Sequence, residues 1–96
     1  GEQIDAGEAL RIGLVSEVVA ASELMPTAER YAEAIISNGP LGVRSAKESM
    51  LRSLGRALED ALRFENLLFC TLTRTEDFKE GPLAFSEKRP PVWKGR

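Results

Sequence analysis

Glu65 is the ionisable residue whose place in the sequence pattern is most unusual. It follows Leu58 by seven residues, so helical periodicity puts its carboxylate within the apolar stripe of a helix predicted from about residue 56 to 72. A buried carboxylate must be paired or neutralised. One interpretation is a structural ion pair with Lys47 of the preceding helix, and the other is a buried general acid. The ion pair is favoured, because no second acid, base or oxyanion donor accompanies Glu65.

Other chemistry is limited by the residue types that are missing. The chain has no histidine, which excludes imidazole general-base catalysis and Ser-His or Cys-His nucleophiles. Cys70 is the only cysteine, so an internal disulfide is impossible and no zinc site is expected around it. A single thiol fits the reducing cytosol, and we expect a cytoplasmic protein without a metal site.

Charge is distributed unevenly along the chain, although the formal net charge is only −2. All 15 acidic residues precede residue 88, whereas residues 88–96 contain four bases and no acid. The Pro90-Pro91 pair predicts that this basic tail is extended. A short basic tail on an acidic body suits an anionic ligand or an acidic partner surface. It is a poor match to a nucleic-acid binder, which usually has a basic face over the whole domain.

The elements that must position these residues are mainly helical. Apolar residues recur at spacings of three and four. Capping residues mark the ends of most segments, with Asp5 and Thr75 as N-caps and Gly13 and Gly55 as helix ends. We predict a mainly α fold, a small assembly of about four to six helices with one short extended segment. No apolar run approaches the ~20 residues that span a bilayer, so no membrane partner is expected. The predicted segments are a helix over 6–12, an extended stretch over 14–19, helices starting after Ser22, at Pro40 and near residue 56, and two short turns over 75–87 broken at Gly81-Pro82.

The helix predicted near residues 56–72 has more apolar surface than one core requires. Its stripe is formed by Leu58, Ala61, Leu62, Leu68, Phe69 and Leu72. Phe64 and Leu67 lie outside that stripe. A helix that is apolar over so much of its circumference needs cover on two sides, and a small bundle supplies only one. We therefore expect this chain to dock against another body.

Three stretches, read in order, resemble the C-terminal region of the enoyl-CoA hydratase/isomerase family, the crotonases. They are IDAGEALRIGLVSEVV, ISNGPLGVRSAKESML and TEDFKEGPLAFSEKRPPVWKG, and the resemblance covers essentially residues 1–96. It implies that these residues are the helical trimerisation region of a crotonase-type fold, docked on an N-terminal catalytic α/β spiral that this chain lacks. Partners would be that spiral, further copies in a trimer or hexamer, and acyl-CoA.

The resemblance also implies which residues meet the ligand. Phe85 and Lys88 match the family positions that line the coenzyme A site of a neighbouring subunit. Lys88 would offer its ammonium to a CoA phosphate, and Phe85 would pack beside an apolar or adenine portion. No residue here matches the family's catalytic motifs, so we expect no catalytic residue and no cofactor other than acyl-CoA as substrate. The parent reaction is expected to be hydration of 2-enoyl-CoA thioesters, with isomerisation as the alternative. The exact reaction stays open, because hydratases, isomerases, hydrolases and dehalogenases of the family share this tail.

Simpler interpretations of the same residues stay open. Phe85 could instead pack in the core or in an interface. Lys88 could instead be a solvated cation that stabilises a helix C-terminus. For the whole chain, the alternative is an independent helical protein-interaction module that binds another protein through its exposed apolar face.

Overall fold

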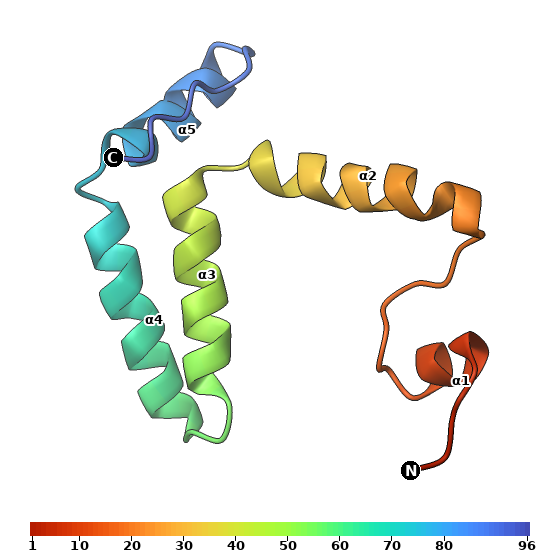
Figure 1. Cartoon of the computed structure of the whole chain (residues 1–96). Helices are drawn as coiled ribbons and strands as arrows, with labels where there is room; N and C mark the ends of the chain where they lie inside the picture. Colours follow the sequence, from red (N-terminus) through yellow and green to blue (C-terminus); the bar gives the residue numbers. More distant parts are fainter. The chain divides into compact units, whose positions relative to one another are not determined.

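The computed structural model describes every residue from Gly1 to Arg96 and consists of helices joined by turns and irregular segments (Figure 1). It contains no strand, so the prediction of a mainly α fold is confirmed. The chain divides into two compact units, Gly1–Glu33 and Ala34–Arg96. The elements are α1 (Ala6–Arg11), the short 3-10 helix η1 (Ala21–Glu23), α2 (Leu24–Ile36), α3 (Pro40–Ser53), α4 (Leu58–Leu72) and α5 (Glu76–Ser86).

Local capping signals fix α1. Asp5 accepts a hydrogen bond of 2.7 Å from the Glu8 amide, which satisfies one of the free N–H groups at the helix start. Gly13 follows the helix with φ +76°, a conformation that glycine adopts without steric cost. The chain then folds back, because the Leu14 amide donates to the Ala9 carbonyl at 2.8 Å.

The extended segment predicted at residues 14–19 is not a strand. Turns and bends occupy residues 12–16 and an irregular stretch follows. The amides of Leu14 and Val15 both point back to the Ala9 carbonyl, so they are not free to join a ladder. Glu17, in the middle of this stretch, instead accepts a hydrogen bond of 2.7 Å from the Tyr31 hydroxyl and pairs with Arg30 at 3.2 Å.

Ser22 is not the cap of α2, which corrects the sequence-based expectation. The residue lies inside η1, whose cap position is Ala20, and its hydroxyl makes no capping bond. The 3-10 turn runs directly into α2 at Leu24. Such a tight turn satisfies first-turn amides through backbone carbonyls, as the 2.9 Å bond from Glu23 to Ala20 shows, so no side-chain cap is required.

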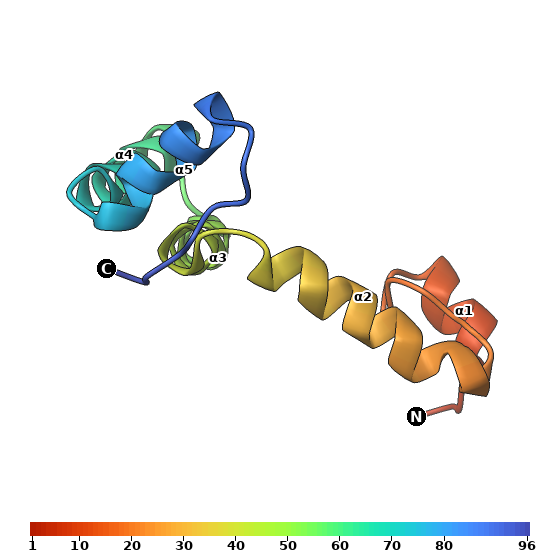
Figure 2. The same cartoon turned by 90° about the horizontal axis from the view of Figure 1, so that it is seen from above.

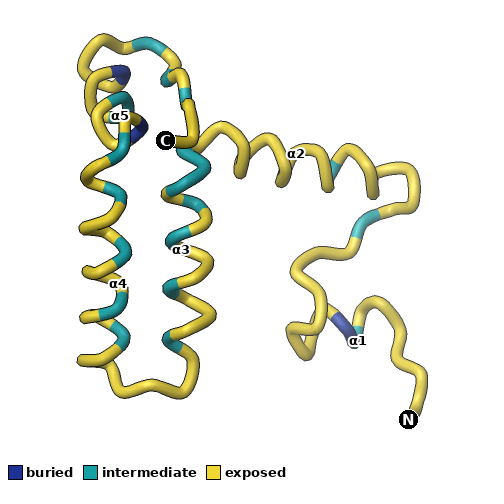
Figure 3. Tube along the Cα trace, turned by 60° about the vertical axis from the view of Figure 1, so that its left-hand side comes forward, coloured by how far each residue is buried: buried dark blue, intermediate teal, exposed yellow.

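The hairpin of α3 and α4 forms the longest contact in the second unit (Figures 1 and 3). Pro40 starts α3 and Gly55, at φ +75°, turns the chain toward α4, as expected. Along α4 the half-buried side chains recur at spacings of three and four, and along α3 small serines recur every four residues. These spacings allow the ridge of side chains on α4 to pack into the groove along the serines of α3. The half-buried positions of this interface are Ser45, Ser49 and Ser53 on α3 and Ala61, Phe64, Leu68 and Leu72 on α4.

This register changes which face of α4 is covered. Phe64, expected outside the stripe, belongs to it, and the guanidinium groups of Arg52 and Arg56 lie 5.7 and 5.9 Å from its ring centre. Leu58 and Leu62, expected within the stripe, are exposed. Periodicity alone therefore placed the apolar stripe on a face of α4 that overlaps, but does not coincide with, the face that meets the serines of α3.

α5 is one continuous helix, so the predicted break at Gly81-Pro82 is wrong. Pro82 lies inside the helix, where it has no N–H to donate and its ring crowds the preceding turn. Contacts from the chain after the helix reach both sides of the proline. Arg89 binds Glu80 on one side at 2.6 Å and Glu87 on the other at 2.6 Å, which supports a helix that the proline weakens.

Very little of the chain is buried. Ala9 and Ala84 are the only buried apolar residues, and Asp77 is the only buried charged one. By contrast, many large apolar side chains are exposed, for example Leu54 at 77% and Leu58 at 75%. The helices therefore present far more apolar surface than they enclose (Figure 3). No helix combines the length and the hydropathy that a bilayer crossing requires.

Candidate ligand-binding site

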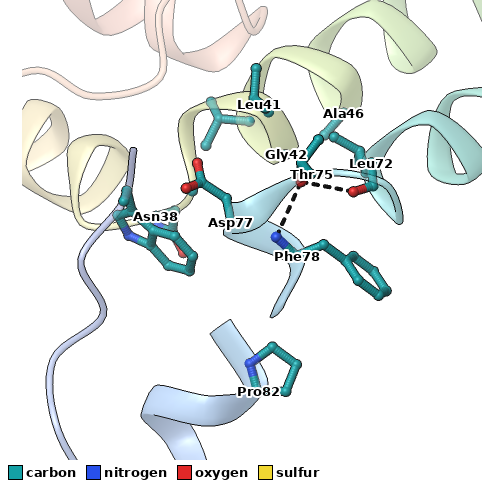
Figure 4. A pocket seen from close by; sticks show the side chains of 12 residues that line it. Asn38, Leu41, Gly42, Ala46, Leu72, Thr75, Asp77, Phe78 and Pro82 are labelled. Atoms are coloured by element: carbon teal, nitrogen blue, oxygen red, sulfur yellow. Dashed lines mark hydrogen bonds between the residues drawn. The ribbon is translucent and has the colours of Figure 1, made fainter. Parts of the chain in front are cut away.

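The candidate site is built on the C-terminal turn of α5. Thr75 caps the other end of this helix, because its hydroxyl accepts a hydrogen bond of 3.1 Å from the Phe78 amide (Figure 4). Phe85 lies in the last turn and is 87% exposed, so no part of this chain packs on its ring. The interpretation of Phe85 as a core anchor therefore finds no support within the chain, although a contact with another body is compatible with this exposure.

Lys88 lies just beyond α5 in a left-handed conformation, with φ +54°. Its amide donates to the Phe85 carbonyl at 3.2 Å, and the next amide, that of Arg89, donates to Ala84 at 3.0 Å. These two bonds form a Schellman motif, a helix ending that usually has glycine at the left-handed position. The motif connects the backbone of Lys88 directly to that of Phe85, so the two candidate side chains leave the same helix end.

Lys88 is also the only base of the tail whose charge is free. Arg89 is paired with Glu80 and Glu87, and Lys94 and Arg96 are both paired with Glu76, at 2.9 and 3.1 Å. The tail was expected to suit an anionic ligand or an acidic partner surface, but acids of α5 and its end pair with three of its four bases. The ammonium of Lys88 makes no ion pair within the chain and stays available to an outside anion.

The pair of Glu80 and Arg89 was not foreseen from the sequence. Two guanidinium nitrogens of Arg89 donate to the two carboxylate oxygens of Glu80, at 2.6 and 3.0 Å. The Val92 amide adds a bond of 2.8 Å to the same carboxylate. The hydrogen bonds from Arg89 and then from Val92 lower the pKa of Glu80 to about 2. The sequence feature that could have indicated this pair is the spacing of nine residues between Glu80 and Arg89, with a helix end between them.

Asp77 holds the distal part of the tail. It is 7% exposed, and its two carboxylate oxygens accept hydrogen bonds from the amides of Lys94 and Gly95, at 2.7 and 2.9 Å. The Arg96 carbonyl in turn accepts from the first amides of α5, at 2.7 and 3.2 Å. The tail, which was predicted to be extended, turns at Lys88 and Arg89 and has no regular secondary structure from Pro90 onward. It runs back from the end of α5 toward α3 (Figures 1 and 2).

An apolar groove lies beneath this tail. It has a volume of about 470 Å³ and is formed by the start of α3, the end of α4 and the first half of α5 (Figure 4). Trp93 borders it and is packed against two glycines, because a Cβ on Gly39 or Gly81 would meet the indole at 3.5 or 3.3 Å. The groove is open and carries few polar atoms apart from Asn38, Thr75 and Asp77, so it has little with which to orient a ligand.

The ion pair expected between Lys47 and Glu65 is absent. Both side chains are exposed, and no salt bridge links them. The reason is the register of α3 and α4 described above, because Glu65 lies at the edge of the contact beside Leu68 rather than in its centre. The premise of a buried general acid at Glu65 fails for the same reason. No group of three or more potential metal-ligating side chains occurs in the structure.

Comparison with known proteins identifies the family. The enoyl-CoA hydratase/isomerase family matches residues 1–96. The chain is 45% identical over 95 residues to (E)-benzylidenesuccinyl-CoA hydratase of Thauera aromatica, covering 99% of this chain and 37% of that protein. It is 40% identical over 100 residues to carnitinyl-CoA dehydratase of Escherichia coli K12, covering 100% of this chain and 38% of that enzyme.

The fold agrees with the sequence match. The crystal structure of an enoyl-CoA hydratase from Bacillus anthracis superposes with a TM-score of 0.94 at 41% identity, covering 100% of this chain and 37% of that one. The chain thus belongs to the enoyl-CoA hydratase/isomerase family, and its helices match the C-terminal region of crotonase-fold enzymes. It spans less than two-fifths of the length of the relatives that it matches.

Proposed function

We propose that this chain is the C-terminal assembly and CoA-capping region of an enzyme that acts on acyl-CoA thioesters. The observation that carries the proposal is the pairing of a free ammonium at Lys88 with an exposed aromatic ring at Phe85, on one helix end. Coenzyme A offers phosphates for the first and an adenine for the second. One lysine and one ring do not enclose a ligand, so the rest of the CoA site is supplied by other parts of the enzyme.

The reaction that we propose is the addition or removal of water at the double bond of an enoyl-CoA. The support is that the similar proteins are named as a hydratase and a dehydratase of CoA thioesters. The catalytic groups would lie in the longer enzyme, outside these 96 residues. The role of this chain would be structural and ligand-binding, and a cytoplasmic location stays a prediction from its single cysteine.

The exposed apolar faces of the helices support the assembly role. Leu54, Leu58 and Ile36 are each more than 70% exposed, and exposed apolar side chains of this size need cover. We propose that the remainder of the enzyme covers part of it and that neighbouring subunits of a trimer or hexamer cover the rest.

The test is CoA binding by the longer enzyme with single substitutions in α5 and its end. Lys88→Ala is expected to raise the dissociation constant of CoA about tenfold, which corresponds to loss of one charge-assisted contact. Phe85→Ala is expected to weaken binding by a similar factor. Lys79→Ala is the matched control, because Lys79 is an exposed lysine of the same helix. Equal affinity of the Lys88 and Lys79 variants would contradict the proposal.

A further inference from the structure

The backbone at Lys88 is unusual for its residue type. At φ +54° it is the only residue other than glycine with a positive φ in the chain. Side chains with a Cβ are disfavoured there by contact with the following carbonyl, and glycine normally occupies this position of a Schellman motif. A lysine at this position is therefore held in a conformation that it does not prefer, and surrounding contacts must supply the restraint.

Those contacts come through Arg89. Its amide closes the Schellman motif on Ala84 at 3.0 Å, and its guanidinium donates to Glu80 twice, at 2.6 and 3.0 Å. A further bond of 2.6 Å reaches Glu87, the residue on the other side of Lys88. Both residues that flank Lys88 are thus joined to each other by side-chain bonds, and the pair is anchored on α5 by Glu80.

The anchor itself is rigidly placed. The Glu80 side chain is only 19% exposed and also accepts the Val92 amide at 2.8 Å, so three hydrogen bonds fix its carboxylate. Movement of Arg89 would break a fork-shaped, charge-assisted contact, which is among the stronger polar interactions in proteins. Besides the two backbone bonds of the Schellman motif, the left-handed turn at Lys88 is therefore held mainly by the side-chain contact between Glu80 and Arg89.

We propose that Glu80 and Arg89 are positioning residues, which hold Lys88 in its left-handed conformation so that its ammonium and the Phe85 ring reach the same CoA molecule. The inference rests on the proposed function, because it takes CoA as the ligand of Lys88. Neither Glu80 nor Arg89 contacts the ligand in this scheme. Their contribution is to remove alternative backbone conformations of Lys88 before CoA binds.

A purely structural role for the pair is the competing explanation, and the tail offers a control for it. Asp77 also fastens the tail to α5, but it does so at Lys94 and Gly95, several residues beyond Lys88. Asp77→Asn is therefore expected to loosen the tail without releasing the turn at Lys88. Glu80→Gln keeps the side-chain shape and an acceptor for Val92 but removes the charge that binds Arg89.

The experiment measures dissociation constants in the longer enzyme for two probes, CoA and pantetheine, which lacks the adenine and all of the phosphates. Glu80→Gln and Arg89→Lys are expected to weaken CoA binding about three- to tenfold and to leave pantetheine binding unchanged. Asp77→Asn is expected to change neither constant, although it lowers the melting temperature. The double variant Glu80→Gln/Lys88→Ala is expected to bind CoA no more weakly than Lys88→Ala alone, because both act through one contact.

The outcomes separate the two proposals. If Lys88→Ala weakens CoA binding and Glu80→Gln and Arg89→Lys do not, the positioning role is wrong while the proposed function stands. If Lys88→Ala has no effect on CoA binding, the proposed function is wrong and the positioning role falls with it. A loss of CoA affinity in Asp77→Asn equal to that in Glu80→Gln would show that tail stability alone governs binding, and would also overturn the inference.

Discussion

The indole N–H of Trp93 donates a hydrogen bond of 2.9 Å to the carbonyl of Ser37, which lies 56 positions earlier in the chain. This bond joins the tail to the turn between α2 and α3. With the indole also in contact with Gly39 and Gly81, one side chain connects the start of α3 to the middle of α5. The C-terminal residues are thus a structural strap across the second unit.

Removal of the indole tests this strap. Trp93→Ala is expected to lower the free energy of unfolding by about 3 kcal/mol, through lost packing on the two glycines. Trp93→Phe keeps most of the packing but loses the donor, and about 1 kcal/mol is expected. Chemical unfolding at a fixed chain concentration measures both. A loss of less than 0.5 kcal/mol in Trp93→Ala (roughly the effect of a neutral surface change) would contradict the strap.

Asp77 is a second residue that fastens the tail to α5. Asp77→Ala leaves the amides of Lys94 and Gly95 without their charged acceptor, which is expected to cost about 3 kcal/mol. Amide hydrogen exchange reports the effect locally, and the protection of Lys94 and Gly95 is expected to fall by more than that of the α4 amides. Unchanged protection of these two amides would show that the carboxylate does not hold them.

The contact between Glu80 and Arg89 predicts a specific dependence on pH. The folded pKa of Glu80 is about 2, below its ordinary value of 4.5. The unfolded chain therefore binds a proton before the folded chain does as the pH falls. The stabilisation is present in full above pH 4.5 and is lost as the pH falls toward 2.

A side-chain carboxyl chemical shift measures this directly. The Glu80 signal is expected to titrate with a midpoint near 2, and the stability difference from Glu80→Gln is expected to shrink between pH 4.5 and 2. The exposed Glu59 is a suitable comparison signal from another helix. A Glu80 midpoint near 4.5 would mean that Arg89 does not engage it in solution.

The uncovered apolar surface predicts association of the 96-residue chain. Its exposed side chains include many leucines and isoleucines and both methionines, and burial of apolar area is the main drive for association. Sedimentation velocity at micromolar concentration is expected to show dimers or larger species that dissociate on dilution. A single monomeric boundary at these concentrations would contradict the assembly role.

Local signals in the sequence predicted the ends of several helices well. Each of these signals involves only residues within about one helical turn, so its role could be predicted without knowledge of the fold. The residues are Asp5, Gly13, Pro40 and Thr75. Tertiary contacts explain the two secondary-structure predictions that were wrong. The stretch at residues 14–19 had strand-like residues but bonds back to Ala9, and Pro82 stays within α5 because the tail supports both sides of it.

The sequence predicted only part of the candidate site. Phe85 and Lys88 were proposed from family resemblance, and the structure places them on one helix end, although ligand binding itself stays a prediction. No periodic pattern in the sequence predicted the left-handed turn at Lys88 or its support by Glu80. The burial of Glu65 was predicted wrongly because the sequence does not show which face of α4 meets the serine face of α3.

A crystal structure of the longer enzyme with bound CoA is the most direct test of the central claim that the end of α5 contacts coenzyme A. The account predicts that the Lys88 ammonium lies within hydrogen-bond distance of a CoA phosphate oxygen, about 2.7–3.2 Å, with the Phe85 ring against the adenine or the pantetheine arm. CoA bound with its phosphates in solvent, or against another cation while Lys88 stays unpaired, would contradict it.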